Sequence, residues 1–158
     1  MRTLIIYDSQ YGNTEKIAQS IANVLSQQGE VEIVRVRDVK LDMFKGIDLL
    51  VVGSPTQQFR ASESMRLFLK NSSKDLVKGI RVAAFDTRLT QAFVDKHPPL
   101  SIFESMFGYA AARIAKALKQ KGGLLLVPGE GFYVDDTEGP LVAGEVERAE
   151  QWAKKLFA

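Results

Sequence analysis

The sequence contains no cysteine and a single histidine, His97. The lack of cysteine excludes a disulfide scaffold, a thiolate metal site, a thiol nucleophile and redox chemistry on cysteinyl sulfur. One histidine excludes a metal centre built from several imidazole ligands. The spacing of serines and carboxylates indicates neither a nucleophile with its base nor a pair of acid–base carboxylates. We therefore assign no metal ligand and no catalytic residue from the sequence.

Long apolar runs and strong charge are also missing. The longest mainly apolar stretches, Ile47–Gly53 and Leu124–Val127, are far shorter than the roughly 20 residues that span a bilayer. The formal net charge is +2, and no run of Lys or Arg concentrates it, so we expect no nucleic-acid partner. The first residues lead directly into an apolar run without the layout of a signal peptide, so we expect a cytoplasmic protein without membrane insertion.

What is present is an ordinary globular composition over 158 residues, with 46% hydrophobic and 25% charged residues. A fold of this length buries roughly 70% of its unfolded surface, so it needs no cross-links. We expect a single domain over residues 1–158.

Apolar runs alternate with segments of helical periodicity along the whole chain. Strands are expected at Leu4–Tyr7, Val31–Val36, Ile47–Gly53, Ile80–Phe85 and Leu124–Val127. Helices are expected at Thr14–Gln28, at Ser62–Lys70, before Gly122 and at Ala143–Phe157, with irregular or polar loops at Asp86–Ser101 and Gly129–Pro140. The helix before Gly122 begins either at a capping box of Ser101 and Glu104 or later, near Tyr109.

Strands with apolar residues throughout, alternating with helices, predict a parallel sheet with helices on both faces. Five strands in this length fit an open doubly wound α/β sheet, because an eight-stranded barrel needs roughly 250 residues. Ligands of such sheets bind beyond the carboxyl ends of the strands.

The segment Ser9–Thr14 follows the first strand and leads into the first helix. Its backbone N–H groups and hydroxyls, together with the positive end of the helix, favour an anionic ligand such as a phosphate. Gly12 permits a positive φ or a close approach of the ligand to the backbone. The same residues would also serve a tight turn with a helix cap and no ligand. The glycine patterns of dinucleotide-binding loops and of P-loops are absent.

Three segments together resemble the flavodoxin family. Ser9–Thr14 resembles its FMN phosphate loop, Ser/Thr-x-Thr-Gly-x-Thr, with Tyr11 in place of the central Thr. Val51–Thr56 resembles the strand that leads into the first flavin-ring loop, and Ala84–Arg88 falls where the second ring loop belongs. Thr137–Leu141 and the helix after it also resemble flavodoxins of this length. The resemblance covers the whole chain and implies a flavodoxin-like five-stranded sheet of order 2-1-3-4-5 with FMN as cofactor.

The resemblance also implies which residues bind FMN. The phosphate would lie on Ser9, Gln10, Tyr11, Gly12, Asn13 and Thr14. The flavin ring would lie between Pro55, Thr56, Gln57, Gln58, Phe59 and Arg60 on one side and Phe85, Asp86, Thr87 and Arg88 on the other. Phe59 is either a ring-stacking residue or a core contact, and Phe85 either reaches the ring or completes a buried strand.

Two departures from the family bear on the chemistry. The segment Pro55–Arg60 has no Gly or Asn, so positive φ values there carry a steric cost, and we expect weak stabilisation of one-electron-reduced flavin. Arg60 and Arg88 stand in the two ring loops, where a guanidinium would favour the reduced anion unless both side chains are simply solvated. We expect a less negative reduction potential than that of acidic flavodoxins.

The favoured interpretation is an FMN-binding electron carrier that serves redox partner proteins or small electron donors and acceptors. Because the chain lacks cysteine, a bound flavin would carry the electrons. One alternative is a small FMN-dependent NAD(P)H:quinone or flavin reductase, whose substrate pocket would come from residues 86–101 and 129–140. A second alternative is a module that binds another phosphate ligand without redox chemistry.

Overall fold

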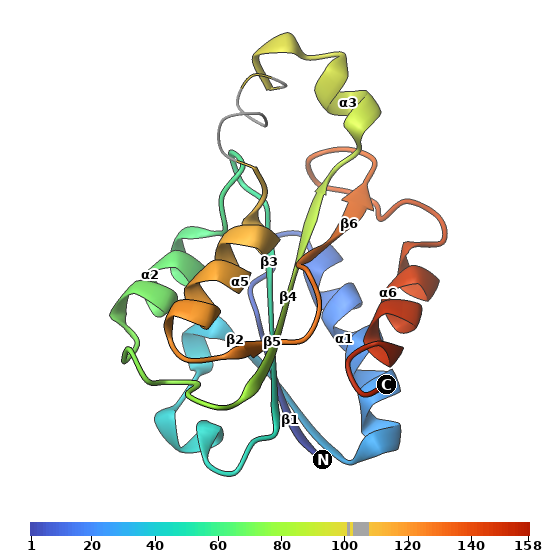
Figure 1. Ribbon diagram of the computed structural model, residues 1–158. Coiled ribbons are helices and arrows are strands. Elements are labelled where there is room, and N and C mark those ends of the chain that lie inside the picture. The colour runs from blue at the N-terminus through green and yellow to red at the C-terminus, as the bar shows by residue number, and fades with distance from the viewer. Residues whose placement is uncertain (101, 103–107) are drawn as a thin grey trace.

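The computed structural model describes residues 1–100, 102 and 108–158 and has a parallel sheet at its centre (Figure 1). The strands are β1 (Arg2–Tyr7), β2 (Glu30–Arg35), β3 (Leu49–Pro55), β4 (Arg81–Leu89), β5 (Leu124–Leu125) and β6 (Glu130–Val134). Their order is β2-β1-β3-β4-β5, and β6 also pairs with β4. The predicted doubly wound α/β fold and its strand order are therefore confirmed, with a sixth strand at the edge.

The central strands are apolar because helices cover both of their faces. The helices are α1 (Asn13–Leu25), α2 (Glu63–Asn71), α3 (Gln91–Asp95), α5 (Ala110–Gln120) and α6 (Glu145–Lys154), with short 3-10 turns at Ser26–Gln28, Val36–Asp38 and Leu41–Phe44. The helices α1 and α6 pack on one face of the sheet, whereas α2 and α5 pack on the other (Figure 1). Successive strand residues point to opposite faces, so Ile5 contributes to the first core and Leu4 to the second.

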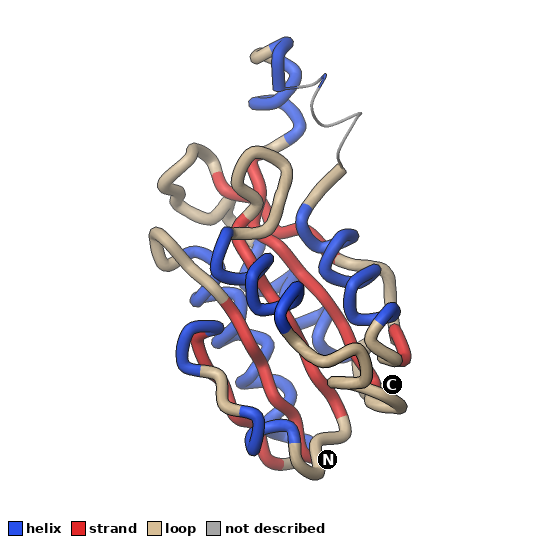
Figure 2. Tube along the Cα trace, turned by 90° about the vertical axis from the view of Figure 1, so that its left-hand side faces the viewer, coloured by secondary structure: helices blue, strands red, loops and turns tan. Residues whose placement is uncertain are grey.

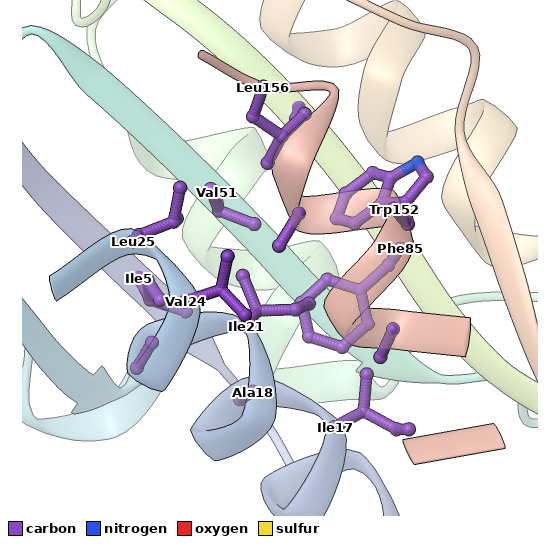
Figure 3. Close-up of a cluster of buried hydrophobic side chains, with 14 of the residues drawn as sticks. Ile5, Ile17, Ala18, Ile21, Val24, Leu25, Val51, Phe85, Trp152 and Leu156 are labelled. Carbon is purple, nitrogen blue, oxygen red and sulfur yellow. The ribbon is translucent and has the colours of Figure 1, made fainter. Parts of the chain in front are cut away.

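The core between the sheet and α1 and α6 is centred on aromatic rings. Phe85 of β4 is fully buried and meets Trp152 of α6 edge-on, with ring centroids 6.2 Å apart. Figure 3 shows Phe85 and Trp152 among the aliphatic side chains of α1, such as Ile17 and Ile21. Phe132 of β6 also packs edge-on against Phe85, which ties the last strand to this core.

The predicted fifth strand is wrong in its extent. Pairing at Leu124–Val127 stops after Leu125, and the segment predicted as a polar loop, Gly129–Pro140, contains β6. This strand pairs in parallel with the second half of β4, from Phe85 to Leu89. The reason is the burial of Phe132 and Val134, two residues apart on one face of β6, which offsets the glycine and acidic residues around them.

The predicted irregular stretch Asp86–Ser101 is wrong in its first part. With β6 as a neighbour, β4 continues to Leu89, and Thr90 then caps α3 by accepting a hydrogen bond from the N–H of Phe93 at 3.2 Å. Figure 2 shows α3 standing beyond the end of the sheet that lies opposite the N-terminus.

The other elements match their predicted positions with displaced ends. The helix before Gly122 begins at Ala110, near the later of the two predicted starts, and the capping box of Ser101 and Glu104 lies outside the described residues. Val36, predicted as the last residue of a strand, is in a 3-10 turn. Among the described residues, no helix has both the length and the apolar composition needed to cross a membrane.

Candidate functional site

A pocket of about 380 Å³ lies at the carboxyl ends of β1, β3 and β4. Its lining consists of Ser9, Gln10, Tyr11, Asn13, Thr14, Pro55, Thr56, Gln57, Gln58, Thr87, Arg88, Leu89, Phe93, Leu100, Val134 and Thr137. Three segments far apart in the sequence therefore meet here, as expected for the carboxyl edge of a doubly wound sheet.

The turn between β1 and α1 forms the first wall of the pocket. The hydroxyl of Ser9 accepts hydrogen bonds from the N–H groups of Gly12 at 3.1 Å and Glu15 at 3.3 Å. Gly12 directly precedes α1 with φ 88°, a left-handed conformation that suits glycine. The hydroxyl thus folds the turn tightly over the start of the helix.

This arrangement leaves a set of donors at the pocket. Within the described part of the chain, the backbone N–H groups of Gln10, Tyr11, Asn13 and Thr14 donate to no protein acceptor. All four residues line the pocket, at the positive end of the α1 dipole. We call these four N–H groups the amide cradle.

The side chain of Arg35 holds the turn between β1 and α1 in place. Arg35 Nη1 donates to the carbonyl of Ser9 at 3.0 Å, and Arg35 Nη2 pairs with Glu15 at 3.1 Å. The hydroxyl of Tyr7 donates to Glu15 at 2.8 Å. Burial, and then the neighbouring Glu15 carboxylate, raise the pKa of Tyr7, so this hydroxyl stays a donor at neutral pH. The Arg35 charge is thus balanced by Glu15, and the anion-binding side of the turn consists of neutral N–H groups.

A tight turn at Gln57–Arg60 borders the second wall. Gln57 and Arg60 exchange two backbone hydrogen bonds, of 2.7 and 2.9 Å, around Gln58 and Phe59. Both central residues have positive φ, 49° and 61°, which resembles the hairpin turn that ordinarily takes Asn-Gly. The glycine-free sequence therefore pays a cost of about 1–3 kcal/mol for each strained residue. Burial of Phe59 offsets part of this cost, because the residue is only 7% exposed and its ring centroid lies 5.7 Å from that of Tyr109.

Side chains connect the walls of the pocket. Gln57 Nε2 donates to Gln10 Oε1 at 2.7 Å, which joins the turn after β3 to the turn after β1. Deeper in, the hydroxyls of Thr14 and Thr87 lie 2.7 Å apart and are buried. The three segments are therefore held together by direct hydrogen bonds.

A buried ion pair lies behind the third wall. Asp86 is fully buried and accepts two hydrogen bonds from Arg88, from Nε and Nη2, each at 2.7 Å. It also accepts from the N–H of Ala111 at 2.8 Å, in the first turn of α5. Burial raises the pKa of Asp86, against the opposing effect of Arg88. Burial also disfavours the charge on Arg88, but its hydrogen bonds to Asp86 outweigh this, and the pKa of Arg88 is raised.

The alternative that Arg88 is a solvated surface residue is therefore wrong. Its side chain is 17% exposed, and its guanidinium lies 3.8 Å from the centre of the Tyr109 ring. It nevertheless lines the pocket, where it is the only charged side chain among the described lining residues.

The structure brings together most, but not all, of the predicted site residues. The pocket lining leaves out Gly12, Phe59, Arg60, Phe85 and Asp86. Phe85 lies in the core and completes a buried strand, the second of the two roles considered for it. Phe59 is buried against Tyr109 and lines a smaller cavity of about 140 Å³ that shares Arg88 with the pocket, so its role at the ring stays a prediction. Asp86 does not line the pocket itself and is linked to it through Arg88 and through the side chain of Thr56.

Part of the lining was predicted only as segments: residues 86–101 and 129–140 were expected to form the substrate pocket of the reductase alternative, and no single residue after Arg88 was assigned to the FMN site. Leu89, Phe93, Leu100, Val134 and Thr137 come from the extension of β4, from α3 and its continuation, and from β6 and the loop after it. These residues lie in segments predicted to be irregular. The available signal was the aromatic Phe93 soon after a strand at the ligand edge of the sheet.

The sequence matches one known protein family. A family model described as "Flavodoxin domain" matches residues 4–128. No curated protein sequence matches the chain.

Solved structures give the same fold. An archaeal flavodoxin superposes with a TM-score of 0.77 at 21% identity, covering 99% of this chain and 96% of that one. Oxidised flavodoxin 2 from Bacillus cereus superposes with a TM-score of 0.69 at 22% identity, covering 99% of this chain and 97% of that one. The rubredoxin:oxygen oxidoreductase of Desulfovibrio gigas superposes with a TM-score of 0.73 at 17% identity, covering 98% of this chain and 35% of that one.

Proposed function

The chain belongs to the flavodoxin family, and we propose that it binds FMN in the pocket at the carboxyl ends of β1, β3 and β4 and transfers electrons through it. The observation that carries this proposal is the amide cradle, which leaves four N–H groups without a protein acceptor at a partly apolar pocket whose one charged side chain, among the described lining residues, is Arg88. The cradle suits a phosphate, and the remaining lining suits a planar ring.

The phosphate would bind at the amide cradle and near the hydroxyls of Ser9 and Thr14. An anion at the start of α1 gains from both the free N–H groups and the helix dipole, so no lysine or arginine is needed. The replacement of the family's central threonine by Tyr11 removes one hydroxyl but leaves the backbone donors in place.

The ring would lie between residues 55–58 and residues 87–93. Leu89, Phe93 and Leu100 supply apolar contacts, while Thr56 and Gln58 supply polar atoms. A pocket of about 380 Å³ falls within the range of roughly 300–1,000 Å³ that accommodates cofactors and other small molecules. The lining residues therefore fit FMN at both ends.

When bound, FMN supplies the redox chemistry that the cysteine-free chain lacks. The chain's own residues bind the phosphate, orient the ring and exclude water from one side of it. In this proposal the partners are redox proteins or small electron donors and acceptors.

A reductase is the second candidate, favoured by one observation. Phe93 and Leu100 extend the pocket wall with residues from the long connection between β4 and α5. Such a wall would shelter a second small substrate beside the ring.

Electron transfer is tested on purified protein reconstituted with FMN. The bound flavin is photoreduced anaerobically, with EDTA as the electron donor, and the reduced protein is mixed with ferricyanide in a stopped-flow instrument. We expect reoxidation of the protein by ferricyanide and no consumption of NADH or NADPH when benzoquinone is the acceptor and no reductase is added. Consumption of NAD(P)H under those conditions would show that the protein is a reductase and not a carrier. Failure to retain FMN would reject both functions.

A further inference from the structure

We infer that Asp86 and Arg88 form a charge-balanced pair that sets the reduction potential of the group in the pocket, with Arg88 beside that group and Asp86 as the positioning residue. This inference rests on the proposed binding of FMN.

Asp86 is held in a fixed position. Its carboxylate is completely buried and is held by three hydrogen bonds, two from Arg88 and one from the N–H of Ala111. The last of these links the carboxylate to the start of α5, whose dipole favours a negative charge there. Asp86 thus lies between a helix end and the arginine, and it does not line the pocket.

Arg88 is held in one orientation by its surroundings. Its guanidinium stacks on the ring of Tyr109 at 3.8 Å, and Tyr109 in turn packs against Phe59 of the strained turn. On β6, a Cβ atom at Gly131 would come within 2.1 Å of Arg88 Nε. The Arg88 side chain therefore lies directly against the backbone of Gly131, which prevents it from moving toward β6. Its charge sits at a defined place in the wall of the pocket.

The charges of Asp86 and Arg88 balance each other. Among the lining residues that the structure describes, Arg88 alone carries a charge. Its side chain is 17% exposed, and that of Asp86 is not exposed at all, so solvent screens the pair weakly. Because the two charges are in direct contact, their fields largely cancel at the ring. Removing the Asp86 charge would leave an uncompensated cation beside the flavin, whereas removing the Arg88 charge would leave an uncompensated anion.

These opposite consequences predict a pattern that a merely structural pair would not give. A cation favours the more negative, reduced flavin, and an anion disfavours it. Asp86→Asn should therefore make the potential less negative and Arg88→Gln should make it more negative. The double variant should return close to the wild-type value, since both charges are gone.

The experiment measures the potential of bound FMN at pH 8 by equilibrium with reference dyes. We expect D86N to favour reduced over oxidised FMN by about tenfold, which is about 30 mV for two electrons. We expect R88Q to shift the ratio in the opposite direction and D86N/R88Q to lie within about threefold of the wild type. R88K, which keeps the charge, should stay near the wild-type potential. Asp42→Asn is the matched control, because it removes an exposed carboxylate that does not line the pocket.

The outcomes separate this inference from the function it rests on. If the wild-type protein does not bind FMN, the proposed function fails first. If FMN binds but D86N and the double variant have the same potential, or both single variants shift it in the same direction, the charge-balanced pair is overturned. Should D86N fail to fold, the comparison of R88Q with R88K still decides, because equal potentials for these two would exclude an effect of the Arg88 charge.

Discussion

Ser9 organises the turn before α1 through one hydroxyl group. That oxygen accepts from the N–H groups of both Gly12 and Glu15, so it orders the turn that carries the amide cradle. Substituting Ser9 with Ala should cost about 0.5–2 kcal/mol of stability, as the loss of a helix cap does. It should also weaken FMN binding by about tenfold, since the cradle is no longer fixed.

The control for Ser9 lies at the other end of the same helix. Ser26 donates to the carbonyl of Asn23, is exposed and does not line the pocket. We expect Ser26→Ala to leave FMN affinity unchanged in a fluorescence titration. Equal affinities for Ser9→Ala and the wild-type protein would contradict the role given to the Ser9 hydroxyl.

The strained turn at Gln58 makes a second prediction at the residue scale. Gln58 has φ 49°, a conformation that costs an L residue roughly 1 kcal/mol more than glycine. Gln58→Gly should therefore raise the free energy of unfolding by up to about 1 kcal/mol, measured by urea denaturation. Gln57→Gly is the control, because Gln57 is not among the described residues with positive φ and gains no such relief. A loss of stability in Gln58→Gly as large as that in Gln57→Gly would refute the assignment of strain.

At the scale of secondary-structure elements, β6 closes the site against β4. Gly131 allows this, because a Cβ atom there would overlap Arg88. Gly131→Ala should destabilise the protein by about 1–3 kcal/mol through overpacking. The cost should fall when Arg88 is also replaced by Ala, so a double-mutant cycle should show a coupling of at least about 0.5 kcal/mol. Additive costs would mean that the glycine serves another purpose.

The start of α6 is fastened to β6 by Glu145. This carboxylate accepts from the N–H of Tyr133 at 2.7 Å and from Arg148 Nε and Nη2 at 2.8 and 2.7 Å. Burial opposes its ionisation, but these hydrogen bonds outweigh that effect and lower the pKa of Glu145. The stabilisation is therefore present above the unfolded-state pKa of Glu and is lost as the pH falls through the folded-state pKa.

Glu145→Gln tests this pH dependence. We expect the variant to lose about 1–3 kcal/mol at neutral pH, the value of a hydrogen bond to a charged group. As the pH falls from about 7 to about 3, its stability should decline less than that of the wild type, so that the two urea-unfolding curves converge. Curves that stay parallel across this range would show that Glu145 does not titrate differently in the folded and unfolded states.

At the scale of the whole molecule, the parallel sheet could be predicted from the pattern of apolar runs, and its strand order from the resemblance to flavodoxins. β1, β3 and the first half of β4 are buried on both faces, so they read as short apolar runs such as Leu49–Gly53. The second half of β4 and all of β6 could not be predicted, because each is stabilised by the other. Asp86 and Arg88 look like loop residues until their pairing is known, and Phe132 lies among acidic residues and glycines.

At the site too, the local features could be predicted from the sequence, whereas the features that depend on distant residues could not. The turn at Ser9–Thr14 is local in sequence, so its pattern alone indicated an anion site. The wall from Leu89 to Leu100 depends on how far β4 extends, which only β6 determines. The burial of Phe59 depends on Tyr109, fifty residues later, which no local pattern indicates.

The function proposed for this molecule depends on the binding of FMN by the amide cradle and the pocket beside it. The most direct measurement is a fluorescence titration of the flavin-free protein with FMN and, in parallel, with riboflavin, which has the same ring but no phosphate. We expect one FMN to bind per chain and riboflavin to bind at least about a hundredfold more weakly, a difference of about 2.8 kcal/mol supplied by the cradle. Equal affinity for the two flavins, or no binding of FMN, would contradict it.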